Sequence, residues 1–222
     1  MMLITNKYEY KPLQRCEGPH GRRYIVGEGR PLPSVTTILG KMKDMTHIKQ
    51  WKARVGEEEA TRIVTEAGGL GQSMHKNLEN YIVGLPMKGN VMSQVLANLI
   101  IKKGLHKVSE IWGSGVMLYS SGLYAGTTDL VGVHDGIPSI MDYKNSLKDK
   151  KKEWIDDYFM QLSAYALSHN EMYGTDIQRG VVMIATRDAN YQEFIIEGKE
   201  FTQYQTMWAD KVYAYYEKYG FV

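Results

Sequence analysis

The sequence predicts an α/β (α+β) fold, in which a central mixed β-sheet of about five strands is flanked by helices and preceded by an N-terminal helical portion. Three observations support this fold class. Apolar residues recur at helical spacing before residue 106. Segments rich in β-formers and split by turn signals begin at residue 107. A helix, two strands and a last helix then follow.

The N-terminal half predicts an arm followed by helices. Residues 8–33 are rich in Gly, Pro and Arg and indicate a hairpin or arm with β-like pieces at 8–10 and 23–26. Ser34 is suited to N-cap a short helix that Gly40 would end. The run Gly68-Gly69-Leu70-Gly71 predicts a break in a longer helical pattern. The further predicted helices cover residues 46–66, 73–83 and 90–103.

The C-terminal half predicts the sheet. Asp135-Gly136 is a strong hairpin signal between two apolar strand segments. The predicted strands cover residues 107–119, 123–135, 137–143, 180–186 and 191–196, and the predicted helices cover 153–173 and 199–219. A chain of 222 residues is most simply one domain, residues 1–222, with its arm and helical portion at about 1–106 and its core at about 107–222.

Composition excludes several classes of site. The net charge of +2 is too small to indicate nucleic acid by itself, so only the distribution of charge can do so. Cys16 is the single cysteine, which excludes a disulfide within the chain, a Cys₄ zinc site and a cysteine-ligated iron–sulfur cluster. No signal peptide or membrane-length apolar run is present. We expect a protein of a reducing compartment, the cytoplasm, with no membrane partner.

Two acids and a lysine carry the chemical prediction. Asp129 ends Gly126-Thr127-Thr128-Asp129, and Asp142 and Lys144 belong to Asp142-Tyr143-Lys144 on the next predicted strand. Mg²⁺ prefers oxygen ligands and is commonly held by one or two carboxylates plus water and phosphate. On a strand Asp142 and Lys144 point to the same face, where the ammonium can orient or help deprotonate a metal-bound water. The alternative is a solvent-facing ion pair.

Other polar residues extend this pattern. Glu110, where the first long strand begins, is a candidate metal or water ligand. Gln161 and Tyr165 are four residues apart and share one helix face, although core packing also explains such a pair. His75 by itself has the pattern of an ordinary helical histidine.

Taken in order, these motifs resemble a known family. Gly71-x-x-x-His75, Glu110, Gly126-Thr127-Thr128-Asp129, Asp142-Tyr143-Lys144 and Gln161-x-x-x-Tyr165 resemble the RecB-like branch of the PD-(D/E)XK nuclease superfamily. Within that branch the chain is most similar to the mitochondrial genome maintenance exonuclease group and its phage-encoded relatives. The resemblance spans about residues 30–215 and implies a restriction-endonuclease-like catalytic core. Thr128 stands where the wider superfamily has proline.

The resemblance implies a role for each motif. Asp129, Asp142 and the carbonyl of Tyr143 would hold Mg²⁺ or Mn²⁺, with His75 as a further metal ligand. Lys144 would serve the nucleophilic water, and Glu110 would be the acid of the first core motif. Gln161 and Tyr165 would brace the lysine and contact the strand. Relatives that carry an iron–sulfur cluster differ, because this chain lacks the cysteines for one.

Basic residues suggest where nucleic acid would lie. A lysine run directly after the catalytic strand would attract phosphate independently of base sequence, although such runs are commonly solvated loops. Trp51 lies in a second basic region, where aromatic rings can stack on bases. The residues expected to bind DNA are Lys148, Lys150, Lys151, Lys152, Trp51 and Lys52.

The expected function is a Mg²⁺- or Mn²⁺-dependent DNA exonuclease that prefers single-stranded ends, acting in phage or bacterial DNA replication, recombination or end processing. DNA is the expected partner, and the sequence identifies no replication or recombination protein that would accompany it. If the chain is phage-encoded, the compartment is the bacterial host cytoplasm. The alternatives are a structure-specific or double-strand endonuclease of the same fold, a catalytically idle DNA-binding subunit, and an unrelated α+β enzyme with coincidental spacing.

Overall fold

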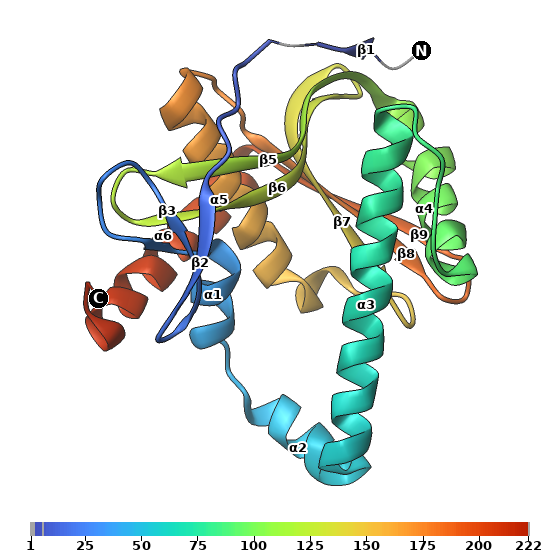
Figure 1. Ribbon diagram of the computed structural model, residues 1–222, viewed down its shortest axis with the longest axis horizontal. Helices are drawn as coiled ribbons and strands as arrows, with labels where there is room; N and C mark the ends of the chain where they lie inside the picture. The colour runs from blue at the N-terminus through green and yellow to red at the C-terminus, as the bar shows by residue number, and fades with distance from the viewer. Residues whose placement is uncertain (1–2, 6, 222) are drawn as a thin grey trace.

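The main sheet of the computed structural model, which describes residues 3–5 and 7–221, has strand order β1-β5-β6-β7-β8-β9 (Figure 1). Five of these strands are long and β1 is a two-residue edge strand parallel to β5. The strands are β1 (Leu3–Ile4), β5 (Val108–Ser120), β6 (Tyr124–His134), β7 (Ile137–Ser146), β8 (Arg179–Thr186) and β9 (Tyr191–Glu197). The predicted mixed sheet is therefore confirmed.

Turn chemistry sets the order of the central strands. Asp135 and Gly136 have φ values of 47° and 78°, and two consecutive positive φ values are what a type I′ hairpin turn requires. β5, β6 and β7 consequently form an antiparallel meander, as predicted. β7 and β8 are parallel, so the chain must cross over between them, which it does through η2 (Lys152–Trp154) and α5 (Asp156–Tyr173).

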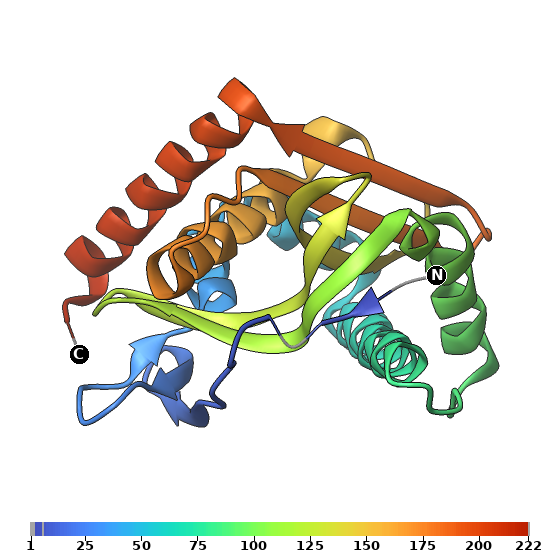
Figure 2. The ribbon, with the colours of Figure 1, turned by 90° about the horizontal axis from the view of Figure 1, so that it is seen from above.

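Helices cover both faces of the sheet, and β8 shows why. Its side chains alternate between two cores: Val182 and Ile184 pack with α5 and α6 (Gly198–Tyr219), whereas Met183 packs with the helices of the N-terminal half. Every residue of β8 is buried, as expected for a strand that is covered on both sides. Figure 2 shows the sheet between these two groups of helices.

The N-terminal half supplies a small second sheet and four helices. The small sheet has the order β2-β3-β4 and docks onto β6 through buried Tyr24, Leu32 and Ala125. Residues 8–10, predicted as β-like, belong to no strand. The elements are β2 (Gln14–Gly18), β3 (Gly21–Ile25), β4 (Leu32–Pro33), α1 (Val35–Lys41), α2 (Thr46–Val55), α3 (Glu57–Ile82), α4 (Val91–Lys103) and η1 (Leu105–Lys107).

Helix ends agree with the sequence in some places and differ in others. Ser34 caps α1, where its hydroxyl accepts a hydrogen bond from the backbone N–H of Thr37 at 3.0 Å. That helix continues through Gly40 to Lys41. The predicted break at Gly68–Gly71 is wrong, because α3 runs through it without interruption. The chain turns instead at Gly56, whose φ of 90° disfavours residues with a side chain.

α2 and the first half of α3 extend away from the main sheet (Figure 1). None of the residues of α2 is buried, so this part of the chain presents its side chains to solvent. The second half of α3 lies against the sheet and contributes buried Met74 and Leu78 to the core. Among the described residues, no helix combines the length and the apolar character needed to cross a bilayer.

Candidate metal-dependent active site

A cleft of about 410 Å³ opens where α3, β6, β7, α5 and the small sheet meet. Most of the residues predicted to act in catalysis or to bind a metal line this cleft, although they come from four elements that are far apart in the chain. They are His75 from α3, Asp129 from β6, Asp142 and Lys144 from β7, and Gln161 and Tyr165 from α5. The backbone of Tyr143 lies between the two β7 side chains.

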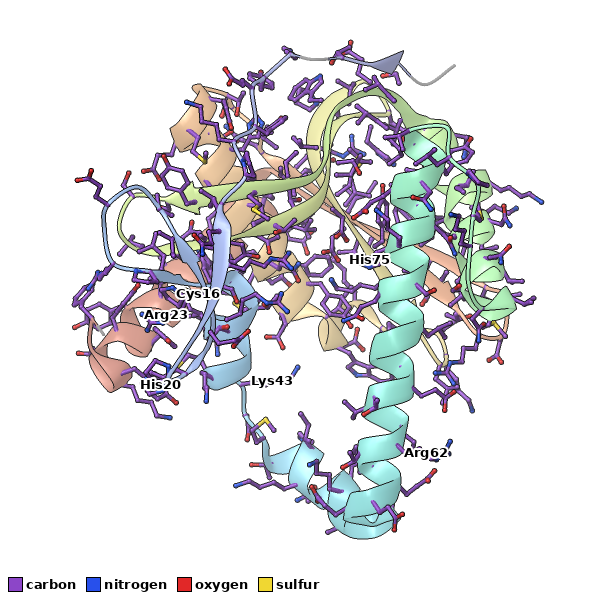
Figure 3. All side chains as sticks on the ribbon, viewed as in Figure 1. Cys16, His20, Arg23, Lys43, Arg62 and His75 are labelled. Atoms are coloured by element: carbon purple, nitrogen blue, oxygen red, sulfur yellow. The ribbon has the colours of Figure 1, made fainter. Side chains whose placement is uncertain are left out.

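His75 connects α3 to the two central strands. Its Nε2 atom lies 2.8 Å from the carbonyl oxygen of Tyr143, and its Nδ1 atom lies 3.2 Å from Oδ1 of Asp129. The backbone N–H of Tyr143 donates to the other carboxylate oxygen of Asp129 at 2.8 Å. Figure 3 shows His75 on the side of α3 that faces the sheet. α3, β6 and β7 are therefore linked through the carboxylate of Asp129 and the backbone of Tyr143.

Lys144 and Gln161 hold Asp142 from two sides. The Lys144 ammonium contacts Oδ2 of Asp142, which confirms that both side chains share one face of β7. Nε2 of Gln161 donates to Oδ1 of Asp142 at 2.9 Å, and Nζ of Lys144 donates to Oε1 of Gln161 at 3.4 Å. The amide thus bridges the acid and the lysine.

The two acids experience different electrostatic surroundings. Burial, helped by the charge of Asp129, raises the pKa of Asp142 to about 6 even though Lys144 acts in the opposite direction. Burial also acts on Asp129, yet the charge and hydrogen bond of His75 hold the pKa of that carboxyl below its usual value. Burial opposes the charged forms of His75 and Lys144, but the carboxylates outweigh it and raise both pKa values. Lys144 is therefore an ammonium at neutral pH.

Two glycines of the motifs permit close approach between elements. A Cβ on Gly71 would lie 2.8 Å from Oδ1 of Asn145 in β7, so glycine lets α3 approach the strand. A Cβ on Gly126 would lie 2.7 Å from the ring of Tyr165, which packs there with 2% exposure. Burial raises the pKa of the Tyr165 phenol well above its ordinary value, so the hydroxyl is neutral.

The donor atoms fit a hard divalent cation. Asp129, Asp142 and the Tyr143 carbonyl offer oxygen, and Nε2 of His75 lies 2.8 Å from that carbonyl. Ligands on adjacent positions of an octahedral ion with bonds of about 2.1 Å are separated by about 3 Å. Mg²⁺ or Mn²⁺ would suit this donor set.

Glu110 does not join the cluster, which corrects the sequence-based placement. It pairs with Val133, four residues along β6 from Asp129, a separation of roughly 13 Å at the rise of a strand. Its Oε2 atom instead accepts a hydrogen bond from the indole N–H of Trp112 at 2.9 Å. Register shifts occur on both sides of this position in β5.

Glu79, an acid that was not predicted as a site residue, lines the cleft. Glu79 follows His75 by one helical turn on the same face of α3. Its carboxylate is the group nearest to Gly115 of β5, at 3.4 Å from a Cβ placed there, and it pairs with Lys76 at 3.1 Å. The i,i+4 spacing from His75 was the signal that could have identified it.

The residues expected to bind DNA lie outside the cleft. Lys148, Lys150 and Lys151 follow β7 in a loop, and Lys152 begins η2. Two of the predicted basic groups are occupied by ion pairs on the surface, Lys152 with Glu200 at 2.6 Å and Lys52 with Glu57 at 2.7 Å. Trp51 and Lys52 lie on the projecting α2. Their contact with DNA stays a prediction.

A second group of metal-binding residue types lies where the β6–β7 turn approaches β9. Nε2 of fully buried His134 lies 3.4 Å from Glu193, whereas Nδ1 lies 3.7 Å from Asp135. One ligand atom from each of the three residues can be chosen so that all three lie within 4.8 Å of one another, which is a spacing that could hold a metal ion. Lys107 at 2.7 Å and Tyr191 at 2.8 Å also bind Glu193. Burial alone would raise the pKa of Glu193, but these partners lower it to about 2.

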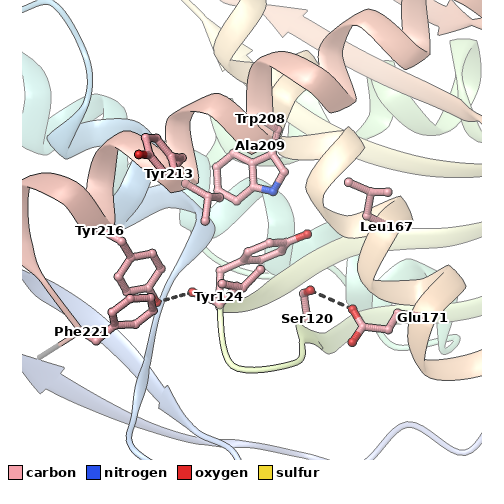
Figure 4. Close-up of a pocket in the computed structure, with 11 residues that line it drawn as sticks. Ser120, Tyr124, Leu167, Glu171, Trp208, Ala209, Tyr213, Tyr216 and Phe221 are labelled. Carbon is pink, nitrogen blue, oxygen red and sulfur yellow. Dashed lines mark hydrogen bonds between the residues drawn. The ribbon is translucent and has the colours of Figure 1, made fainter.

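A larger cavity, of about 520 Å³, lies away from these acids. Figure 4 shows it between α6, the end of α5 and the turn joining β5 to β6. Its walls are mainly aromatic and aliphatic, including Tyr124, Trp208 and Tyr216. Its one acid, Glu171, accepts hydrogen bonds from Ser120 and from the backbone of Ser121. The titratable groups that could support hydrolysis converge in the smaller cleft.

No protein-family model and no curated protein matches the chain. Among solved structures it is similar to SSO0001, at 16% identity and a TM-score of 0.39 over 74% of this chain and 69% of that one. It is similar to a candidate exonuclease from Eubacterium rectale, at 14% identity and a TM-score of 0.46 over 67% of this chain and 65% of that one.

It is also similar to an alkaline exonuclease from Laribacter hongkongensis, at 11% identity and a TM-score of 0.35 over 84% of this chain and 90% of that one. Similarity at these identities and TM-scores assigns no activity to this chain. Its function is therefore inferred from the cleft itself and from the motifs that line it.

Proposed function

We propose that this protein is a Mg²⁺- or Mn²⁺-dependent deoxyribonuclease that hydrolyses phosphodiester bonds. The observation that carries the proposal is the convergence of His75, Asp129, Asp142, Lys144 and Gln161 in one cleft. A surface ion pair would explain Asp142 and Lys144 alone. It would not explain why a histidine from α3 and an amide from α5 are both hydrogen-bonded to β7, at Tyr143 and Asp142.

Each residue has a role that follows from its contacts. Asp129, Asp142, the Tyr143 carbonyl and His75 would hold the cation. When bound, such an ion lowers the pKa of water and stabilises charge on a phosphoryl oxygen. Lys144, as an ammonium, donates hydrogen bonds to the attacking water or to a phosphate oxygen and offsets negative charge there. Gln161 keeps Lys144 beside Asp142.

The finer proposal is an exonuclease that prefers single-stranded DNA ends and acts in replication, recombination or end processing. It is supported by the ordered motifs from Gly71 to Tyr165, which resemble the RecB-like nucleases. Glu79 is proposed as the acid that completes the cleft, in the place expected of Glu110.

Digestion of labelled DNA tests both the metal-dependent nuclease activity and the preference for single-stranded ends. Purified protein is incubated with linear single strands, linear duplex or closed single-stranded circles, in Mg²⁺, Mn²⁺ or EDTA. We expect shortening of linear single strands in either metal, intact circles and no reaction in EDTA. Asp142→Asn should reduce the rate by about 10²-fold or more. Asp210→Asn, at an exposed position on α6, is the matched control and should leave it unchanged.

The alternatives predict different outcomes. Cleavage of the closed circles would replace the exonuclease with an endonuclease of the same fold. If the wild-type protein binds DNA but leaves every substrate intact in both metals, the enzyme proposal fails and an idle DNA-binding subunit replaces it. Equal rates for wild type and Asp142→Asn would show that an activity in the preparation does not come from this cleft.

A further inference from the structure

The cleft has two chemically unlike sides. One side holds the acids, His75 and Lys144 described above. The other side is formed by the small sheet and the start of α1, and it presents Arg15, Arg22 and the hydroxyl of Thr36, beside the hydroxyl of Thr127 on β6. Nothing in the proposed hydrolysis uses these groups. A cationic and hydroxyl-rich surface facing a metal-binding surface needs its own explanation.

The small sheet is held at a defined place on β6. Arg15 donates from Nη2 to the hydroxyl of Thr127 at 3.2 Å, and the hydroxyl of buried Tyr24 lies 3.1 Å from the same oxygen. Ser34, just after β4, forms a parallel bridge with Ala125. These contacts place β2 and β3 against the residues that immediately precede Asp129.

This docking sets the spacing between the two sides. Thr127 and Asp129 are two residues apart on β6, so both side chains point to the same face and are separated by roughly 6.6 Å along the strand. Both line the cleft. The hydroxyl that accepts a hydrogen bond from Arg15 therefore belongs to the residue one strand repeat from the acid that would hold the metal.

The charges on this side are available to a ligand. Arg15 contacts a hydroxyl and lies 5.7 Å from the centre of the Tyr24 ring. Among the residues that the structure describes, neither Arg15 nor Arg22 forms an ion pair, whereas Lys76 and Lys144 in the same cleft each have an acidic partner. A guanidinium presents five donors in a planar fork, which matches the oxygens of a phosphate.

We propose that Arg15 and Arg22 form an anchor for a second phosphate of the bound strand, adjacent to the phosphate that is cut at Asp129 and Asp142. The anchor deepens the proposed nuclease function and rests on it for the nature of the strand. Its ligand is a phosphate group, either an internal diester or a terminal monoester. Binding there would fix the strand along the cleft and set which bond reaches the metal side.

Equilibrium binding in EDTA tests the anchor without requiring cleavage. A fluorescent single strand is titrated with wild type, with Arg15→Ala/Arg22→Ala and with Arg15→Lys/Arg22→Lys over a range of salt concentrations. The slope of log K against log salt is negative, and loss of one phosphate contact should make it less negative by about 0.7. Affinity at low salt should fall about 10-fold in the alanine variant and less in the lysine variant, which keeps the charge.

The matched control removes two charges elsewhere. Lys102→Ala/Lys103→Ala changes exposed residues at the end of α4, which Figure 1 shows on the far side of α3 from the small sheet. It should bind with wild-type affinity and slope. Arg15 and Arg22 are exposed, so the loss of the Arg15–Thr127 hydrogen bond should lower the unfolding midpoint of the alanine variant by no more than a few degrees, and a thermal melt checks that every variant is folded at the assay temperature.

Three substrates distinguish the source of the phosphate. They are a linear strand with a terminal phosphate, the same strand without it, and a closed circle. A loss confined to the phosphorylated end supports an anchor for a terminal monoester, and an equal loss on the circle supports an internal diester. If Arg15→Ala/Arg22→Ala binds all three substrates with the affinity and salt slope of the wild type, the anchor is overturned. If those effects appear but the wild type cleaves nothing in Mg²⁺ or Mn²⁺, the nuclease proposal fails and the phosphate site stands.

Discussion

Three glycines in the middle of α3 offer a direct test of how the helix is positioned over the site. A Cβ placed on Gly68 or Gly69 meets nothing within 4 Å, whereas one on Gly71 lies 2.8 Å from Oδ1 of Asn145. The same substitution, glycine to alanine, should therefore have opposite effects within one turn of helix. The comparison separates helix propensity from close packing.

The magnitudes follow from these two terms. Alanine in a helix interior is favoured over glycine by about 0.8–1.0 kcal/mol, so Gly69→Ala should raise the melting temperature by roughly 2–4 °C. At Gly71 the same gain opposes an overpacking cost of about 1–3 kcal/mol. The side chain of Asn145 cannot simply swing away, because its Nδ2 atom donates to the carbonyl of Ala67 at 3.2 Å. We expect Gly71→Ala to be about 1–3 kcal/mol less stable than Gly69→Ala.

Activity should follow the same order. His75 is one turn beyond Gly71, and its contact with the Tyr143 carbonyl requires that α3 lie close to β7. Displacement of the helix by even a fraction of an ångström should reduce the rate of DNA cleavage about 10-fold. In an Asn145→Ala background the obstacle is removed, so adding Gly71→Ala should stabilise the protein there. Urea unfolding and digestion of a labelled single strand measure both effects.

One result would refute this reasoning. If Gly71→Ala is as stable and as active as Gly69→Ala, the close approach of α3 to β7 does not explain the glycine of the Gly-x-x-x-His motif. The contacts of His75 would then have to be set by other parts of the helix.

Three further predictions concern single side chains. Glu79→Gln should lower kcat/KM about 10-fold or more, while Glu110→Gln, which keeps an acceptor for Trp112, should not; equal losses would restore Glu110 to the site. The pKa of Glu193 is lowered from 4.5 to about 2, so its charge stabilises the fold above pH 4.5, and this stabilisation is lost as pH falls towards 2. Between pH 5 and about pH 3, the urea midpoint of Glu193→Gln should therefore fall less than that of the wild type. Equal falls for the two proteins would contradict this role of the Glu193 charge. Ser34→Ala should cost about 1 kcal/mol, and an unchanged thermal midpoint would show that this cap does not stabilise α1.

The positions of the two acids were predictable because a local signal sets them. The Asp135-Gly136 turn fixes the register of β6 and β7, in which Leu130 pairs with Met141. Asp129 and Asp142 are the next residues on each strand beyond that pair. Once the hairpin is recognised, alternation along β7 also places Lys144 beside Asp142. These steps use neighbouring residues, and sequence patterns report such neighbours reliably.

The continuity of α3 was not predictable in the same way. Three glycines within four residues lower helix propensity by about 1 kcal/mol each, which favours a break when a segment is considered alone. The contact that makes Gly71 necessary comes from Asn145, a residue of β7 far along the chain. Gly56, where the chain does turn, differs from Gly68 in its φ of 90°, which composition does not reveal.

The positions of Glu110 outside the cleft and of Glu79 in its lining were unpredictable for the same reason. A strand position predicts which face a side chain occupies only while the ladder is regular, and β5 has register shifts immediately before and after Glu110 and Ile111. The carboxylate of Glu110 accepts a hydrogen bond from the indole N–H of Trp112, two residues further along β5. Glu79 needs no such regularity, since an i,i+4 position on a helix shares the face of His75 whatever the sheet does. The position of Glu79 therefore depends only on the regularity of α3, the helix that also carries His75. Helix spacing from His75 predicts this position better than strand order predicts the position of Glu110.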